Sequence, residues 1–289
     1  MHEKLPVSVV IATYNSELFL EECLKSVSWA SEIIIVDMYS SDRTIEIAKK
    51  HTDKVFKFKG KIGFPEPAYR FGLEKVANEW VFIFASDEIV PYSLSLKIGD
   101  IIYKDIVDVV YIPRKNFFFG EQLKGGGWGP LQDMHPRLFK RGAVSINETI
   151  HRSFNVSKNV KELFLKDEDL AIIHFNYIDI DHFIDKLNKY TTIEAINMIE
   201  GSKKPFNSLS IIKAILKEFM SRFILRKGYK DGWIGLGLSI LMVTYQISSF
   251  LKLQLMKKYN DYEPRNKIIM EYKKKAAQIV EDSLIKEEG

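Results

Sequence analysis

Two adjacent carboxylates, Asp87 and Glu88, follow the apolar run WVFIF at residues 80–84. A run of this kind predicts a buried strand, and the carboxyl ends of strands are where open α/β sheets bind ligands. Carboxylate oxygens suit a hard divalent cation such as Mg²⁺ or Mn²⁺, which can bridge two phosphates and neutralise a departing nucleoside diphosphate. The pair therefore predicts a metal-assisted phosphate site. An ordinary solvated turn at the strand end is the alternative.

Polar side chains also follow two earlier apolar runs. VSVVIA at residues 7–12 ends at Thr13, Tyr14 and Asn15, and EIIIV at residues 32–36 ends at Asp37. Neither turn carries G-x-G-x-x-G or G-x-x-x-x-G-K-[ST], so no glycine-rich phosphate cradle is present in either. A nucleotide bound at this edge would need side-chain contacts and a metal ion.

Alternating strands and helices are expected to position these residues. The strands are expected at Val7–Ala12, Glu32–Asp37, Lys54–Phe58 and Trp80–Ala85, with helices over about residues 16–27, 42–51 and 67–78. This alternation predicts an α/β fold with a mostly parallel central sheet flanked by helices. A glycine- and aromatic-rich loop is expected from Arg114 to Pro136, followed by a hairpin of residues 135–141 and 143–154.

The pattern becomes helical from Ile178, which predicts a catalytic domain over residues 1–177 and a helical region over 178–289. From Ser202 onward there are 17 Lys and Arg against 9 Asp and Glu, and Gly232–Leu251 contains no charge. We interpret this region as associating with an anionic membrane surface through interfacial helices, and we expect no nucleic-acid partner. A true membrane span, or a soluble helix packed on the catalytic domain, is the alternative.

Several segments resemble glycosyltransferase family 2. They are VSVVIATYNSELFLEECLKSV, IIIVDMYSSDRTIEIAKKH, WVFIFASDEIV, RKNFFFGEQLKGGGWGP, HPRLFKRG and HFNYIDIDHFIDKLNKYTTIEA, in that order. The resemblance covers about residues 5–255 and is to the branch containing bacterial lipopolysaccharide-core glucosyltransferases. It implies the GT-A fold, a nucleotide-sugar donor (a UDP-hexose), a divalent metal and inverting transfer to a lipid-linked or lipopolysaccharide-type glycan.

The resemblance also implies roles for individual residues. Asp37 would accept a hydrogen bond from a uracil-type base, with Thr13, Tyr14, Asn15 and Asp42 lining the nucleotide pocket and Arg137 pairing with diphosphate. Asp87 matches the second aspartate of the family's D-x-D, whereas Ala85 replaces the first. Glu88 would then compensate, and His174 resembles a late metal-ligating histidine. Asn15 and Asp42 could instead serve only as turn and helix caps, and His174 could be structural.

Inverting transfer requires a group that takes the proton of the acceptor hydroxyl. Asp133 lies four residues before Arg137, which matches the family's D-x-x-x-R-L-F, and Glu148 is the second candidate. A loop carboxylate pairing with Arg137 is the structural alternative for either residue. We expect Asp133 to be the base.

The sequence therefore predicts a hexosyltransferase in cell-envelope polysaccharide biosynthesis at the cytoplasmic face of the membrane, because MHEKLP leads directly into the first strand. Two other functions remain open. One is sugar transfer to a polyprenyl phosphate, which needs no general base because the acceptor is already an anion. The other is a catalytically silent binding protein that kept the fold and lost a metal aspartate at position 85.

Overall fold

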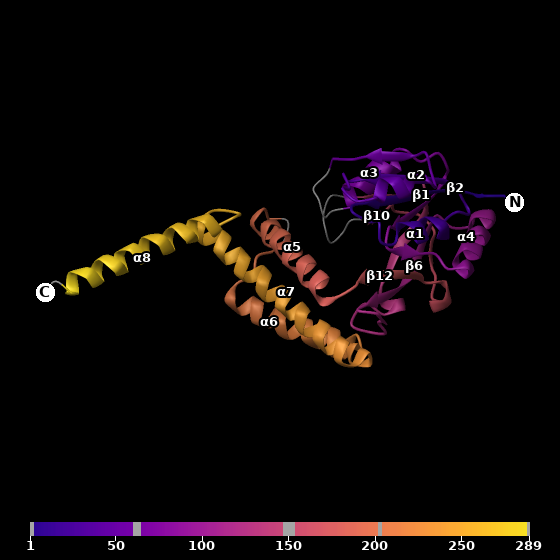
Figure 1. Cartoon of the computed structure of the whole chain (residues 1–289). Coiled ribbons are helices and arrows are strands. Elements are labelled where there is room, and N and C mark those ends of the chain that lie inside the picture. The colour runs from indigo at the N-terminus through magenta and orange to yellow at the C-terminus, as the bar shows by residue number, and fades with distance from the viewer. Residues whose placement is uncertain (1–2, 60–64, 147–153, 202–203, 288–289) are drawn as a thin grey trace. The chain divides into compact units, whose positions relative to one another are not determined.

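The protein is shown in Figure 1 as a computed structural model that describes residues 3–59, 65–146, 154–201 and 204–287. The chain divides into two compact units, Met1–Asp179 and Ile180–Gly289. The sequence places its boundary at residue 177, two residues earlier. The first unit is an α/β domain, and the second is built from helices.

A mixed, mostly parallel sheet forms the centre of the first unit, in the order β3-β2-β1-β4-β8-β6-β12-β5. Its main strands are β1 (Leu5–Thr13), β2 (Ala30–Asp37), β3 (Val55–Lys57), β4 (Trp80–Ala85), β5 (Glu88–Ile89), β6 (Val109–Phe118), β8 (Met134–Lys140) and β12 (Ile172–Tyr177). Short strands β7 (Glu121–Gln122) and β11 (Glu162–Phe164) also pair with β6, and β9 (Val144–Ile146) pairs with β10 (Phe154–Val156). The prediction of a mostly parallel sheet flanked by helices is confirmed.

Helices cover both faces of the sheet because alternate residues of its strands point to opposite sides. Val9 and Ile11 of β1 lie in one core with α1 (Leu20–Ser26), α2 (Thr44–Lys49) and α4 (Tyr92–Lys104). Val10 and Ala12 lie in a second core with α3 (Glu66–Leu73). Strands buried on both faces explain the unbroken apolar runs in the sequence.

Parallel pairing aligns the ends of the strands that carry the predicted site. Thr13 is in register with Asp37, and Ala12 is in register with Ala85. The polar residues that follow β1, β2 and β4 therefore share one edge of the sheet. The hydroxyl of Ser86 lies 2.9 Å from that of Ser16, which joins the loops after β4 and β1.

The structure differs from the sequence expectation beyond residue 108. Strand β6 continues to Phe118, through the start of the expected loop, because β12 pairs with it in parallel from Arg114 onward. The expected hairpin is wrong: β8 lies between β4 and β6, antiparallel to both, while β9 pairs with β10. The pairings of β8 with β4 and β6 join segments distant in sequence, which local patterns do not encode.

The second unit contains α5 (Ile180–Ile199), α6 (Ser208–Phe219), α7 (Gly232–Tyr259) and α8 (Arg265–Glu287). Its buried cluster joins Ala195 and Met198 of α5 to Leu253 and Met256 of α7. One helical stretch among the described residues, Gly228–Tyr259, is long and apolar enough to cross a membrane by length and composition. The core helix of a soluble protein can satisfy the same criteria.

Candidate active site

The predicted nucleotide pocket begins with a buried contact between two strand ends. Thr13 and Asp37 have no exposed surface, and the Thr13 hydroxyl donates to Oδ1 of Asp37 at 3.0 Å. The same carboxylate accepts from the backbone N–H of Ser40 at 2.9 Å and from its hydroxyl at 2.5 Å. Asp37 thus fixes the loop after β2 from beneath, while Tyr14 and Tyr39 are the exposed aromatic side chains of these loops.

Asn15 and Asp42 join the loops after β1 and β2. Asn15 has a left-handed backbone conformation (φ 48°), and its side-chain oxygen accepts from the backbone N–H of Ser41 at 2.8 Å. Asp42 accepts from the backbone N–H groups of Thr44 at 3.0 Å and Glu17 at 3.1 Å. Burial would raise the pKa of Asp42, but its hydrogen bonds from Thr44 outweigh burial and lower it. These contacts match the turn and cap alternative for both residues.

Glu88 does not occupy the position expected of a metal ligand. Its carboxylate is fully buried and accepts from Nη2 of Arg137 at 2.7 Å and Nη1 of Arg114 at 3.3 Å. Its other oxygen accepts from the backbone N–H of Ala85 at 2.8 Å. Burial would raise the pKa of Glu88, but the charges of Arg137 and Arg114 outweigh burial and lower it. Glu88 is therefore a buried anion paired with arginines.

Arg137 also differs from its expected role. It is 6% exposed and donates to Glu88 and to the carbonyl of Ile83, the latter at 3.4 Å. A side chain buried in this way anchors Glu88 beneath the sheet edge and is not presented to a diphosphate. The alternative pairing of Arg137 with Asp133 is not observed either, because Asp133 pairs with Arg114.

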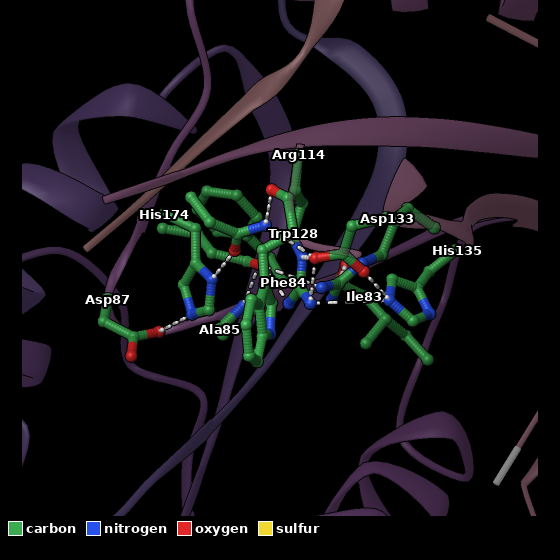
Figure 2. Close-up of polar contacts among 12 residues, drawn as sticks. Ile83, Phe84, Ala85, Asp87, Arg114, Trp128, Asp133, His135 and His174 are labelled. Carbon is green, nitrogen blue, oxygen red and sulfur yellow. Dashed lines mark hydrogen bonds and ion pairs between the residues drawn. The ribbon is translucent and has the colours of Figure 1, made fainter. Parts of the chain in front are cut away.

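Asp87 and His174 do lie together, as the sequence predicts. Strand β12 pairs with β5, and this places Nε2 of His174 3.6 Å from Oδ1 of Asp87 (Figure 2). Nδ1 of His174 lies 2.7 Å from Oδ1 of Asn116. The Asn116 amide nitrogen donates to Asp133 and to the carbonyl of Trp128, so its oxygen must accept from His174. In the neutral imidazole, the lone pair of Nε2 then faces Asp87.

This arrangement fits a divalent cation held by two protein ligands. Two neighbouring ligands of an octahedral cation lie about 3 Å apart, close to the observed Asp87–His174 separation. Among the described residues, no group of three or more His, Cys, Asp or Glu side chains could hold a metal by itself. The remaining ligands would therefore come from phosphate oxygens and water, as is usual for Mg²⁺ at phosphate sites.

Asp133, the expected base, is held by four donors. Its Oδ2 accepts from Nε and Nη2 of Arg114 at 3.0 and 2.7 Å and from Asn116 at 2.7 Å. Its Oδ1 lies 2.7 Å from Nε2 of His135. Burial would raise the pKa of Asp133, but the hydrogen bond from His135 and the charge of Arg114 hold it far below its usual range.

Sequence reasoning missed three members of this network: Arg114, Asn116 and His135. Arg114 and Asn116 lie on the part of β6 that was expected to be a loop. His135 lies within the expected D-x-x-x-R-L-F segment, so its proximity to Asp133 was the available signal. Figure 2 shows Asp87 and His174 at one end of the network and His135 at the other. Glu148, the second expected base, lies outside the described residues.

The Thr13–Asp37 contact and the Asp87–His174 pair lie at the carboxyl edge of a mostly parallel sheet, where open α/β folds bind their ligands. The chain belongs to glycosyltransferase family 2, whose sequence model ("Glycosyl transferase family 2") matches residues 8–159. The family resemblance is thereby confirmed, and the chain is a glycosyltransferase.

Individual relatives agree with this classification. The chain is 26% identical over 264 residues to the lipopolysaccharide core biosynthesis glycosyltransferase LpsC of Rhizobium meliloti, covering 87% of this chain and 92% of LpsC. It is 24% identical to an uncharacterised glycosyltransferase of Rickettsia conorii, covering 93% and 95% of the two chains. Among solved structures, it is similar to residues 1–349 of Staphylococcus aureus TarS in complex with UDP-GlcNAc. That similarity has a TM-score of 0.47 and 16% identity, with 89% of this chain and 93% of that chain covered.

Proposed function

We propose that the chain transfers a hexose from a UDP-sugar, with inversion, to a lipid-linked or lipopolysaccharide-type glycan. The observation that carries this proposal is the Asp87–His174 pair, 3.6 Å apart beside the loops that follow β1 and β2. With His174 oriented by Asn116, the pair can hold Mg²⁺ or Mn²⁺ between the protein and a nucleoside diphosphate. Such a cation supplies charge neutralisation for the departing diphosphate.

The protein's own residues would divide the remaining work. Asp37 would accept a hydrogen bond from a uracil base once the loop after β2 moves aside, because its carboxylate is buried and already accepts from Thr13 and Ser40. The exposed rings of Tyr14 and Tyr39 would flank the base from the loops above. The Asp133 end of the network would face the acceptor. The similarity to LpsC supports a lipopolysaccharide-type acceptor.

Release of UDP from a panel of UDP-sugars, with and without Mn²⁺, tests the donor and the metal. We expect turnover of at least one UDP-hexose that needs Mn²⁺ or Mg²⁺ and is nearly abolished by Asp87→Asn. Calorimetry should show that Asp37→Asn weakens UDP binding by about 1–3 kcal/mol, the cost of an unpaired polar partner. Full turnover in excess chelator would contradict the metal, and unchanged UDP affinity would exclude Asp37 from the pocket.

We further propose that the second unit holds the enzyme on the cytoplasmic face of an anionic membrane. Leu209, Ile212 and Leu216 of α6 are all more than half exposed, and their spacing places them on one face of the helix. Met220 continues that face, and Lys213 and Lys217 lie within the same segment. An exposed apolar face with adjacent lysines is typical of a helix lying in the membrane interface, where each near-surface charge contributes about 1 kcal/mol.

Sedimentation with vesicles tests this location. The chain should bind vesicles that contain phosphatidylglycerol at low salt, and binding to pure phosphatidylcholine should be weaker. Leu216→Glu should reduce binding, whereas Leu96→Glu, at a similarly exposed leucine of α4, should not. Protein that stays in solution with anionic vesicles at low salt would contradict membrane association. Resistance to high salt and alkaline carbonate would instead support a span by α7.

A further inference from the structure

The Asp133–His135 pair is the part of the network whose geometry does not match the expected base. An aspartate that acts as base needs a free lone pair and a tendency to take a proton. Asp133 is 11% exposed, and Oδ2 alone accepts three hydrogen bonds from Arg114 and Asn116. Three hydrogen-bond donors on one oxygen stabilise the carboxylate anion, which makes it a weak proton acceptor.

His135 has the complementary properties. An ionised carboxylate only accepts hydrogen bonds, so Nε2 of His135, 2.7 Å from Asp133, must carry a proton. Nδ1 then carries the lone pair, and it has no hydrogen-bond partner among the residues that the structure describes. The His135 side chain is 39% exposed, so it reaches solvent where Asp133 does not.

We propose that His135 takes the proton of the acceptor hydroxyl at Nδ1, with Asp133 as the positioning residue that orients its ring. The role rests on the glycosyl transfer proposed above. As the acceptor oxygen forms its bond to the anomeric carbon, its O–H proton moves to Nδ1. The bond from the anomeric carbon to the diphosphate breaks, and its electron pair leaves with UDP. The exposed imidazolium then returns the proton to solvent.

The charges around His135 are compatible with this role. Burial lowers the pKa of His135, the Asp133 carboxylate opposes this decrease, and Arg114 and Arg137 add to it. The net pKa is below the ordinary value of 6.5, so the ring is neutral and able to accept a proton at pH 7. Asp133 stabilises the imidazolium as it forms, as a carboxylate does in other Asp–His pairs.

The pH dependence of kcat for UDP release from UDP-glucose, UDP-galactose and UDP-N-acetylglucosamine tests the assignment, with water as the acceptor whose proton His135 takes. Wild type should show an acid limb, with kcat rising as His135 loses its proton. His135→Gln should lower kcat by about 10²–10⁴-fold, leave the KM for the donor unchanged and remove the limb. Imidazole added to His135→Ala should restore part of kcat. His51→Gln is the matched control and should behave as wild type, because His51 follows α2 and contacts Glu21 of α1.

The Asp133→Asn variant distinguishes His135 from Asp133 as the base. If His135 is the base, this variant should keep an acid limb that moves to lower pH, because the carboxylate that raises the pKa of His135 is gone. Nitrogen NMR should show that neutral His135 carries its proton on Nε2 in wild type. An Asp133→Asn variant without any acid limb, together with a His135→Gln variant that keeps its kcat, would assign the base to Asp133 and overturn our inference. A wild-type chain that is inactive on every UDP-sugar would instead overturn the proposed function.

Discussion

Glu88→Gln distinguishes a buried ion pair from a metal ligand. Glutamine keeps the length and shape of the side chain and removes its charge. In the folded protein, Glu88 is completely buried and accepts hydrogen bonds from Arg114, from Arg137 and from the backbone of Ala85. The variant would place an amide group, part of which is a donor, against two guanidinium groups.

The loss of stability in Glu88→Gln depends on which hydrogen bonds each arginine keeps. Arg114 keeps its two hydrogen bonds to Asp133, whereas Arg137 keeps only a 3.4 Å contact to the carbonyl of Ile83. Removing one partner of a buried ion pair costs about 3–5 kcal/mol, because the other charge stays buried without compensation. In a domain of this size, we expect Tm to fall by about 6–20 °C.

Thermal unfolding of the full chain, followed by circular dichroism, measures this loss. Glu46→Gln is the control, since Glu46 makes an exposed pair with Lys50 and should leave Tm unchanged. Asp87→Asn should also keep Tm in the absence of metal but should lose the stabilisation that Mn²⁺ and UDP give to the wild type. Glu88→Gln would thus lower Tm, whereas Asp87→Asn would keep Tm and lose the stabilisation by Mn²⁺ and UDP.

The reverse pattern would refute this reasoning. If Glu88→Gln unfolds within 2 °C or so of wild type and no longer responds to Mn²⁺ and UDP, then the carboxylate binds metal and the arginine pairing is dispensable. Such a result would restore the role that the sequence predicts for Glu88. It would also imply that the loop after β4 rearranges when the donor binds.

Two further predictions concern the same network. Asn116→Leu removes the acceptor that orients His174, so calorimetry should show about 10–100-fold weaker binding of Mn²⁺ with UDP. Asn155→Leu, at the exposed residue of β10, should have no effect. The pKa values of Glu88 and Asp133 are lower in the folded protein than their ordinary values near 4. The unfolded chain therefore binds more protons than the folded chain as the pH falls through about 4, and stability is lost there and retained above it. Urea midpoints between pH 3 and 7 should show this decrease, with a smaller slope for Asp133→Asn, and a flat profile would contradict the lowered pKa values.

The extent to which the sequence predicts the site depends on which part of the sheet holds each residue. Strands β1, β2 and β4 are buried on both faces, so they appear as apolar runs, and the residues at their ends could be placed correctly. Asp87 could be placed in this way, whereas His174 lies on β12 and its pairing with Asp87 was expected only from the family resemblance. The Thr13–Asp37 contact follows from the parallel register of the same strands.

The remaining contacts depend on long-range pairing and on the direction of a turn. Glu88 follows Asp87 directly, and no periodicity in the sequence shows which of two adjacent carboxylates turns inward. That choice is made by Arg114 and Arg137, which approach Glu88 from β6 and β8. Because β8 enters the sheet antiparallel between β4 and β6, its position could not be derived from the regular alternation of strand and helix.

The network also explains how the proposed metal position could stay ordered in a chain with alanine at position 85. The backbone N–H of Ala85 donates to Glu88, so the buried glutamate fixes the turn that carries Asp87. Asn116 then connects the two halves of the site, since its oxygen orients His174 and its nitrogen donates to Asp133. Buried charges and amides of this kind cost stability unless every group is paired. Under the proposed mechanism, this pairing would fix the distance between the leaving diphosphate and the group that takes the acceptor's proton.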